Sequence, residues 1–326
     1  MGEKSPKLLK HSRSWQVLWL AATAAAALAA AALRRWQLRS AFEEYSGLAV
    51  PGAQASVILA CALAMTGAGL ALLSLVGRPL PEQVRWDQVF LSAGDRAFPV
   101  LEVAAAFFAI ASVPVLFIVG VNQFQVYQDA LAAGVQPPTD NGLLTLATAG
   151  GAFLAALGLL QTGRDSLNPG RRGRGGFSII LPGVAGCIWL MESFRSHAAN
   201  PVRWDYVPQL MAIMLGMAFY MDFAGMSAGA ARPRRLLWMA GMTSVFSTVA
   251  LVSAAAELAA RPSLFCAQLG DVLLLLSQTL AAAGVLWRLP ASLAWPDLNR
   301  SSRNGPPRQD PGFEPSQEIQ EDTDDE

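Results

Sequence analysis

Long apolar runs, broken by short polar segments, make up most of this chain. A membrane-spanning helix needs about 20 mostly apolar residues. Eight runs reach or approach that length, at residues 15–33, 53–77, 98–120, 142–161, 177–194, 207–230, 236–257 and 264–287. Proline, glycine and asparagine fall in the breaks between them, as expected of residues that interrupt helices. The pattern predicts an all-α, polytopic transmembrane helical bundle with about eight spans.

The composition favours a chain that lies in lipid. Hydrophobic residues make up 53% of the 326 positions, and only 15% are Asp, Glu, Lys or Arg. A soluble domain usually carries about 25% of these charged residues, so too little charge is present to cover a soluble surface. The 24 basic and 24 acidic residues cancel, so no positive field indicates nucleic acid as a partner. The lipid bilayer is the expected environment.

Lysine and arginine positions predict how the chain is threaded. Residues 1–14 form a basic tail, and the apolar run after it is longer than the roughly 7–15 residues of a secretory signal core. We therefore expect an uncleaved first helix. With this tail inside, 18 of the 24 basic residues fall on the cytoplasmic side and six on the other. Because basic residues near spans are retained in the cytoplasm, both ends are predicted to be cytoplasmic, in a multi-pass protein of the cell (plasma) membrane.

The last residues, 289–326, differ from the membrane domain at 15–288. They are rich in Pro, Asn, Arg, Ser and Gln, and they end in an acidic run. Such a segment has too little apolar surface to fold by itself, so a disordered C-terminal tail is expected. It is either a solvated tail or a docking site for a partner protein.

Two loops on the predicted outer side share a short pattern. Arg39-Ser40 precedes Val50-Pro51, and Arg195-Ser196 precedes Val207-Pro208 at a similar spacing. Two interpretations stay open. One is a pair of parallel four-helix halves, related by an axis along the membrane normal, and the other is chance.

The motifs that carry enzyme or metal chemistry are missing from the sequence. Its two histidines and three cysteines are far apart and form no zinc-binding pattern. No phosphate-binding glycine loop or nucleophile motif occurs either. We therefore expect no catalytic residues, no metal and no cofactor.

Acidic and amide side chains within the spans need an explanation, because charge is costly at membrane depth. Asp222 lies in the inner half of the sixth predicted span and is the strongest candidate there for a buried acid. Asp271 lies near the outer start of the eighth span, on one face with Gln268 and Gln278. That polar stripe predicts either hydrogen bonds between helices or a ligand site. Glu102 lies one turn into the third span, where we expect it to snorkel to the inner surface.

The densest polar cluster is at the outer end of the fifth span and in the loop that follows. It contains Glu192, Arg195, His197, Asn200 and Asp205. Glu192 and Arg195 are three residues apart, so we expect them to pair on one helical face. Together with Asp222 and Asp271, the cluster is the candidate ligand site, suited to a polar or zwitterionic ligand. The alternative is a set of ordinary anchors at the membrane surface.

Residues 181–212 resemble a pattern in bacterial multi-pass membrane proteins. The likeness is carried by Leu181-Pro182-Gly183, Cys187-Ile188-Trp189-Leu190, Ala199-Asn200-Pro201-Val202, Tyr206 and Leu210-Met211-Ala212. That family has no assigned activity, so the resemblance implies a class of protein and no catalytic residues.

Two functions are compatible with these features. The one we favour is binding or transport of a small molecule or lipid by the helical bundle. The alternative is a non-catalytic membrane scaffold or accessory subunit that docks through its tail and loop. An enzyme is the least favoured class, because no spacing of a nucleophile and a base supports one.

Overall fold

The computed structural model describes residues 6–43, 48–76, 86–90, 96–138, 140–167, 177–198, 206–230, 232–260 and 265–293. These residues are almost entirely helical, and their one β contact is an isolated bridge between Phe42 and Ala49. The helices are α1 (Pro6–Ser40), α2 (Gln54–Val76), α3 (Trp86–Val89), α4 (Ala97–Ala132), α5 (Leu143–Leu167), α6 (Ile180–Ala198), α7 (Val207–Gly225), α8 (Pro233–Ala260) and α9 (Phe265–Leu293). A short 3-10 turn, η2 (Phe177–Ile179), leads into α6.

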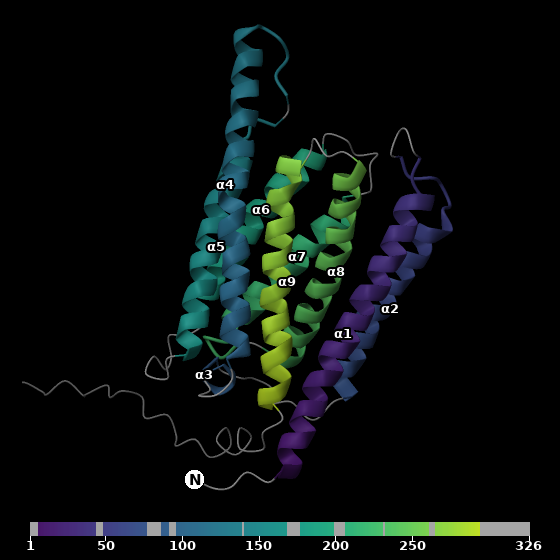
Figure 1. Cartoon of the computed structure of the whole chain (residues 1–326), viewed down its shortest axis with the longest axis vertical. Coiled ribbons are helices and arrows are strands. Elements are labelled where there is room, and N and C mark those ends of the chain that lie inside the picture. Colours follow the sequence, from purple (N-terminus) through teal and green to yellow (C-terminus); the bar gives the residue numbers. More distant parts are fainter. Residues whose placement is uncertain are drawn as a thin grey trace, which may run out of the picture.

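The prediction of an all-α transmembrane bundle is confirmed. Each of the eight predicted spans overlaps one long helix, and seven of these helices in the described chain are long and apolar enough to cross a membrane. The eighth is α6, which runs alongside the others (Figure 1) and carries polar residues in its last turns. The protein is therefore a multi-pass helical bundle.

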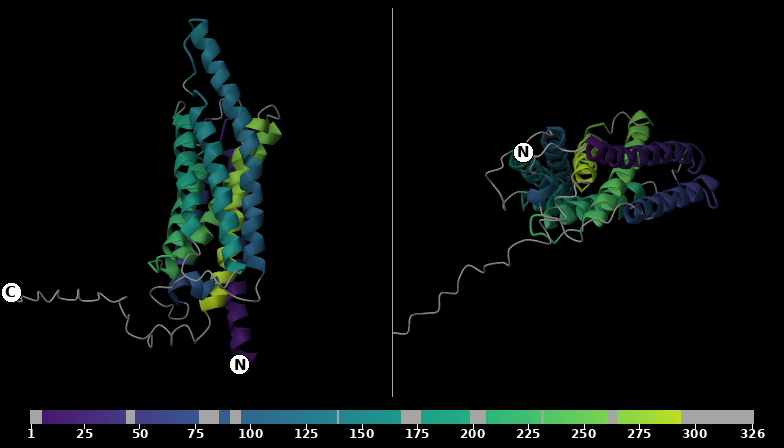
Figure 2. Two further views of the ribbon diagram at one scale, coloured as in Figure 1. Left: turned by 90° about the vertical axis from the view of Figure 1, so that its left-hand side faces the viewer. Right: turned by 90° about the horizontal axis from the view of Figure 1, so that it is seen from below.

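The helices form one layered group around α8 and α9. The hairpin of α1 and α2 packs on α8 at one flank, whereas α4 and α5 pack on α9 and α6 at the other. Figures 1 and 2 show these two pairs on opposite sides of the molecule. The first four spans therefore do not form a compact half of their own, and the two parallel halves considered from the sequence are not separate units in space.

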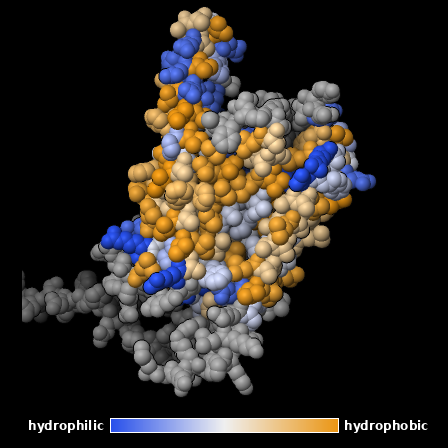
Figure 3. Space-filling model, viewed as in Figure 1, coloured by the Kyte–Doolittle hydropathy of each residue, from blue (hydrophilic) through white to orange (hydrophobic). Residues whose placement is uncertain are grey.

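The outer surface of the bundle is apolar. Figure 3 shows a broad hydrophobic face across its middle, with hydrophilic residues towards the two ends. Large side chains such as Val57, Met65 and Phe107 are 60%, 68% and 66% exposed. Contiguous apolar surface of this kind is covered by lipid in a membrane protein.

The two ends of the bundle differ. The described part of α1 begins and α9 ends at the same end of the bundle (Figure 1), which we call the lower end. An even number of crossings has this result. At the opposite, upper end, α4 projects beyond its neighbours. Its 36 residues correspond to about 54 Å of helix, more than the roughly 30 Å of a hydrocarbon core.

A glycine makes the turn between α4 and α5 possible. Gly142 has a φ of 70°, in the left-handed region that favours glycine. A Cβ atom on it would lie 2.3 Å from the Gly120 carbonyl oxygen of α4. The chain therefore returns against α4 more closely than any side chain would allow.

The short helix α3 lies at the lower end of the bundle (Figure 1), where the hydropathy pattern predicted no helix. The Trp86 backbone N–H donates to the Met226 carbonyl at 3.1 Å, and the Val89 carbonyl accepts from Arg288 Nε at 2.9 Å. Trp86 and Phe90 of this segment then pack against rings from α4 and α7. We call this set the lower aromatic cluster, which consists of Trp86, Phe90, Phe98 and Phe223.

Candidate functional site

Two acids from different helices meet near the upper end of the bundle. Asp271 of α9 accepts hydrogen bonds from Trp189 Nε1 of α6 at 2.8 Å and from Gln209 Nε2 of α7 at 3.1 Å. Glu192 lies one turn beyond Trp189 on α6. We call Glu192 and Asp271, with these donors, the upper acidic cluster.

Glu192 is held less firmly than Asp271. The Thr145 hydroxyl oxygen of α5 lies 3.3 Å from Glu192 Oε1 and 2.9 Å from Gln123 Oε1 of α4. A hydroxyl group has one proton to donate, so the amide of Gln123, at the shorter distance, competes with Glu192 for it. The charges that act on Glu192 are the acids Asp271 and Asp140. Neighbouring like charges repel, so this cluster favours a cation or a proton between the acids.

The structure separates the residues that the sequence grouped as a candidate ligand site. Glu192 and Asp271 are brought together. Arg195 is on an exposed position of α6, and its pairing with Glu192 stays a prediction. His197 belongs to the last turn of α6. Asn200 and Asp205 lie outside the described residues.

Asp222, the strongest candidate for a buried acid, is partly exposed and forms an ion pair. Its Oδ2 atom lies 2.7 Å from Arg235 Nε, at the start of α8 near the lower end. Asp222 follows Gln209 by 13 positions on α7, which places it about 20 Å from the upper acidic cluster along the helix. Asp222 lies towards the end of the bundle at which α1 begins, but the sequence analysis did not identify its arginine partner on the next helix.

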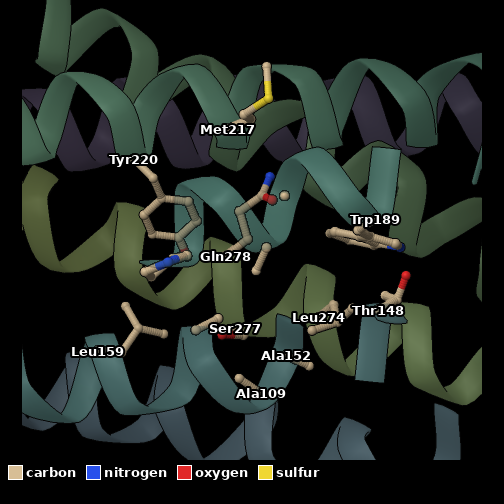
Figure 4. Close-up of a pocket in the computed structure, with 14 residues that line it drawn as sticks. Ala109, Thr148, Ala152, Leu159, Trp189, Met217, Tyr220, Leu274, Ser277 and Gln278 are labelled. Carbon is tan, nitrogen blue, oxygen red and sulfur yellow. The ribbon is translucent and has the colours of Figure 1, made fainter. Parts of the chain in front are cut away.

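A small cavity lies below the upper acidic cluster. Its volume is about 40 Å³, enough for water but far below the roughly 300–1,000 Å³ of a pocket for a metabolite. Figure 4 shows Gln278 between Tyr220 and Trp189 in this space. The polar side chains that line the cavity are Thr148, Trp189, Tyr220, Ser277 and Gln278.

Gln278 connects three helices at the cavity wall. Its Nε2 atom donates to the Ala212 carbonyl of α7 at 2.7 Å and to Ser247 Oγ of α8 at 3.1 Å. A Cβ atom on Gly216 would lie 2.1 Å from the Gln278 amide, so the glycine makes space for it. Asp271 and Gln278 of the predicted polar stripe thus bond to neighbouring helices, while Gln268 Oε1 is buried without a partner among the described residues.

Glu102 does not snorkel, contrary to the prediction. It is 0% exposed, and neither carboxyl oxygen has a hydrogen-bond partner among the described residues. Its neighbours are Gly163 of α5 and Gly284 of α9, and the Tyr220 phenol of α7 is close enough to interact with it. Glu102 does lie near the beginning of α4, as predicted, but α4 is rotated so that this side chain faces the interior of the bundle.

These groups follow one another through the bundle. Trp189 borders both the upper acidic cluster and the cavity, and Tyr220 borders both the cavity and Glu102. On α4, Glu102 and Gln123 are 21 positions apart, or about 30 Å, which is close to the thickness of a hydrocarbon core. We call this series the polar row, which consists of Glu192, Asp271, Trp189, Gln278, Tyr220 and Glu102.

The sequence analysis missed most of the groups that complete the site. Trp189 was named only as part of the resemblance of residues 181–212, and Gln123, Thr145 and Gln209 were not considered. One signal was available for Trp189, because it lies three positions before Glu192 and so shares its helical face. Within the described part of the chain, no three His, Cys, Asp or Glu side chains are placed to hold a metal ion.

Comparison with known proteins identifies no relative. The resemblance of residues 181–212 to bacterial multi-pass membrane proteins therefore stays a prediction. No protein-family model matches the sequence, and searches of curated proteins and of solved structures found no significant similarity.

Proposed function

We propose that this protein binds and transports a small polar solute across a membrane, and that the solute is a cation. The observation that carries the proposal is the polar row, which extends for about the thickness of a membrane within α4, α6, α7 and α9. Ionisable groups inside a membrane bundle usually mark solute or proton pathways, because they are too costly to keep otherwise.

The chemistry at the upper end supports a cation. Asp271 and Asp140 are each close enough to act on Glu192, and the Trp189 indole donates to Asp271 at the same place. Carboxylates accept hydrogen bonds from an ammonium group, and an indole face attracts a positive charge. A primary organic ammonium ion is therefore the ligand class that we assign to this cluster.

Transport requires the cavity to open. At about 40 Å³ the cavity holds water but no organic solute, so the structure corresponds to a closed form. In such proteins the two sides of the bundle move about a fixed site near the middle of the membrane. Trp189 above and the lower aromatic cluster below are the closures that we assign to the two sides.

The proposed location is the cell membrane, with the lower end in the cytoplasm. Arg232, Arg234 and Arg235 precede or begin α8 at that end, and Arg288 is near the end of α9. This distribution follows the bias of basic residues towards the cytoplasm. The upper acidic cluster then faces the outside.

Binding of ethylammonium by the protein in lipid nanodiscs tests the proposal. Tryptophan fluorescence is the readout, and because the chain has nine tryptophans, Trp189→Phe identifies the part of the response that comes from Trp189. Ethanol is the neutral control ligand. We expect a saturable response to ethylammonium that is lost in Glu192→Gln and in Asp271→Asn and is absent with ethanol. Glu257→Gln is the matched control, since this acid is exposed near the upper end of α8. An equal response in all variants, or none in the wild type, would contradict cation binding here.

The alternative is a scaffold or accessory subunit. The upper part of α4 favours it, since this projecting segment exposes Phe124, Val126 and Leu131 (37%, 58% and 49%) beyond the bundle. The tail from 294 onward lies outside the described residues, so its docking role stays a prediction. Deletion of residues 300–326 followed by a pull-down of partners tests it, and unchanged recovery would argue against the tail.

A further inference from the structure

Glu102 is the one fully buried carboxylic side chain of the described residues that lacks any hydrogen-bond partner. Both of its oxygen atoms are enclosed and unbonded. Buried polar groups are almost always satisfied, and an exception calls for a functional explanation. In a membrane bundle such a carboxyl group is far less costly as a neutral acid than as an anion.

The surroundings of Glu102 offer no charge to balance an anion. Glycines face it from two sides, Gly163 on α5 and Gly284 on α9, and a Cβ atom on Gly284 would lie 3.4 Å from Glu102 Oε1. Among the described residues of α5, α7 and α9, the Tyr220 phenol is the titratable group that interacts with Glu102.

The charged residues nearby on the same helices are engaged elsewhere. Asp165 of α5 accepts a hydrogen bond from Gln161 at 3.5 Å. Arg288 of α9 donates to the Val89 carbonyl at 2.9 Å, and Asp222 of α7 pairs with Arg235. None of these groups is arranged around the Glu102 carboxyl group.

Glu102 lies between two closures. Above it, Tyr220 separates it from the water-sized cavity. Below it, Phe98 is one turn earlier on α4 and contacts Trp86 and Phe90, with ring centroids 6.0 Å and 4.6 Å away. The rings of Trp86 and Phe90 therefore cover Phe98, the residue that precedes Glu102 by one turn.

We propose that Glu102 is a proton-binding site of the polar row, which exchanges protons with the lower end when α3 moves. The inference rests on the proposed transport function and gives it a coupling ion. Protonation joins one proton to a carboxylate oxygen, and release returns it to water. No other reactant is needed.

Infrared spectroscopy of the reconstituted protein at neutral pH tests this directly. A protonated carboxyl group has a C=O stretching band that a carboxylate lacks, and the band shifts when its proton is exchanged for deuterium. We expect a band that is lost in Glu102→Gln, remains in Glu192→Gln, and shifts in heavy water. Glu102→Asp keeps the acid and should keep a displaced band, which guards against a folding defect in the glutamine variant.

Two results would overturn the inference. In one, Glu102→Gln leaves the carboxylic-acid region of the spectrum unchanged. In the other, the Glu102 band never shifts in heavy water, which would make it an isolated structural acid. Trp86→Leu thins the lower aromatic cluster and should make the deuterium shift several-fold faster. An unchanged rate in this variant, with normal helix content, would contradict access through α3.

Failure of this inference is distinguishable from failure of the proposed function. The ethylammonium titration reports on the upper acidic cluster, whereas the infrared band reports on Glu102. If the wild-type protein shows the exchangeable Glu102 band but no ethylammonium response, the proton site is supported and cation binding is contradicted. If it shows the ethylammonium response but no Glu102 band, cation binding is supported and the proton site is contradicted.

Discussion

Trp189 donates its indole N–H to Asp271, a residue 82 positions later in the chain, at 2.8 Å. The same indole lines the cavity beneath (Figure 4). One side chain therefore fixes the orientation of a carboxylate and closes the space that leads away from it. Trp189→Phe removes the donor but keeps an aromatic ring. A hydrogen bond to a charged group contributes about 1.5–3 kcal/mol, and we expect a loss of stability near the lower value.

Unfolding of Trp189→Phe in mixed detergent micelles measures that loss. The comparison is Trp36→Phe, because Trp36 is 43% exposed and has no comparable role. If the two variants lose the same free energy of unfolding, the bond to Asp271 does not hold α6 against α9.

Gly216 provides the space for Gln278. A methyl group at position 216 would lie 2.1 Å from the Gln278 amide, so Gly216→Ala should displace the amide and break its bonds to α7 and α8. Overpacking of a core typically costs about 1–3 kcal/mol, and we expect a loss of this size in the free energy of unfolding. Gly150→Ala is the control, because nothing lies within 4 Å of its added Cβ atom. Equal stability of the two variants would show that Gln278 is not held in place.

Two glycines in the connection between α4 and α5 allow the cost of backbone strain to be measured separately from the cost of steric overlap. Gly134 and Gly142 have similar φ angles of 66° and 70°. A Cβ atom at 134 meets nothing within 4 Å, whereas one at 142 would lie 2.3 Å from the Gly120 carbonyl oxygen. Gly134→Ala should therefore cost about 1–2 kcal/mol from conformation alone, and Gly142→Ala clearly more. Thermal unfolding of both variants checks the order, and a larger loss at position 134 would contradict it.

The Asp222–Arg235 pair is expected to contribute little to stability. Arg235 is 59% exposed, and exposed ion pairs contribute about 0–1 kcal/mol. Arg235→Gln should therefore change the free energy of unfolding only slightly and leave the ethylammonium response intact. Loss of that response would place Asp222 in the same functional unit as Asp271, which the distance along α7 argues against.

Hydropathy predicted the helices well because burial in lipid depends on composition along a run. It predicted the end of the third span at residue 120, yet α4 continues to Ala132. The extra turns contain Asn122, Gln123, Gln125 and Gln128, which lower the hydropathy but do not interrupt a helix. The short helix α3 was not predicted because it is held by groups far away in the chain. Its backbone bonds to the Met226 carbonyl and to the Arg288 side chain.

The site was predicted only in part, because partners come from separate helices. Glu192 and Asp271 were both identified as polar groups in costly places, and the structure brings them together. The position of a residue along its predicted span did not reveal that Glu102 faces the interior or that Arg235 pairs with Asp222. Both facts depend on how each helix is rotated about its axis. An almost uniformly apolar helix has no distinct hydrophilic face, so its sequence does not indicate that rotation.

Access of a water-soluble cation to the cavity is the most direct test of the polar row. Ser277→Cys places a thiol on the cavity wall, and Val57→Cys places one on the exposed apolar face of α2, both in a background without the native cysteines. The thiol reagent methanethiosulfonate ethylammonium reacts from water. We predict that it modifies position 277, that ethylammonium slows this reaction, and that position 57 stays unmodified. A cysteine at 277 that reacts no faster than one at 57 would contradict a pathway through this part of the bundle.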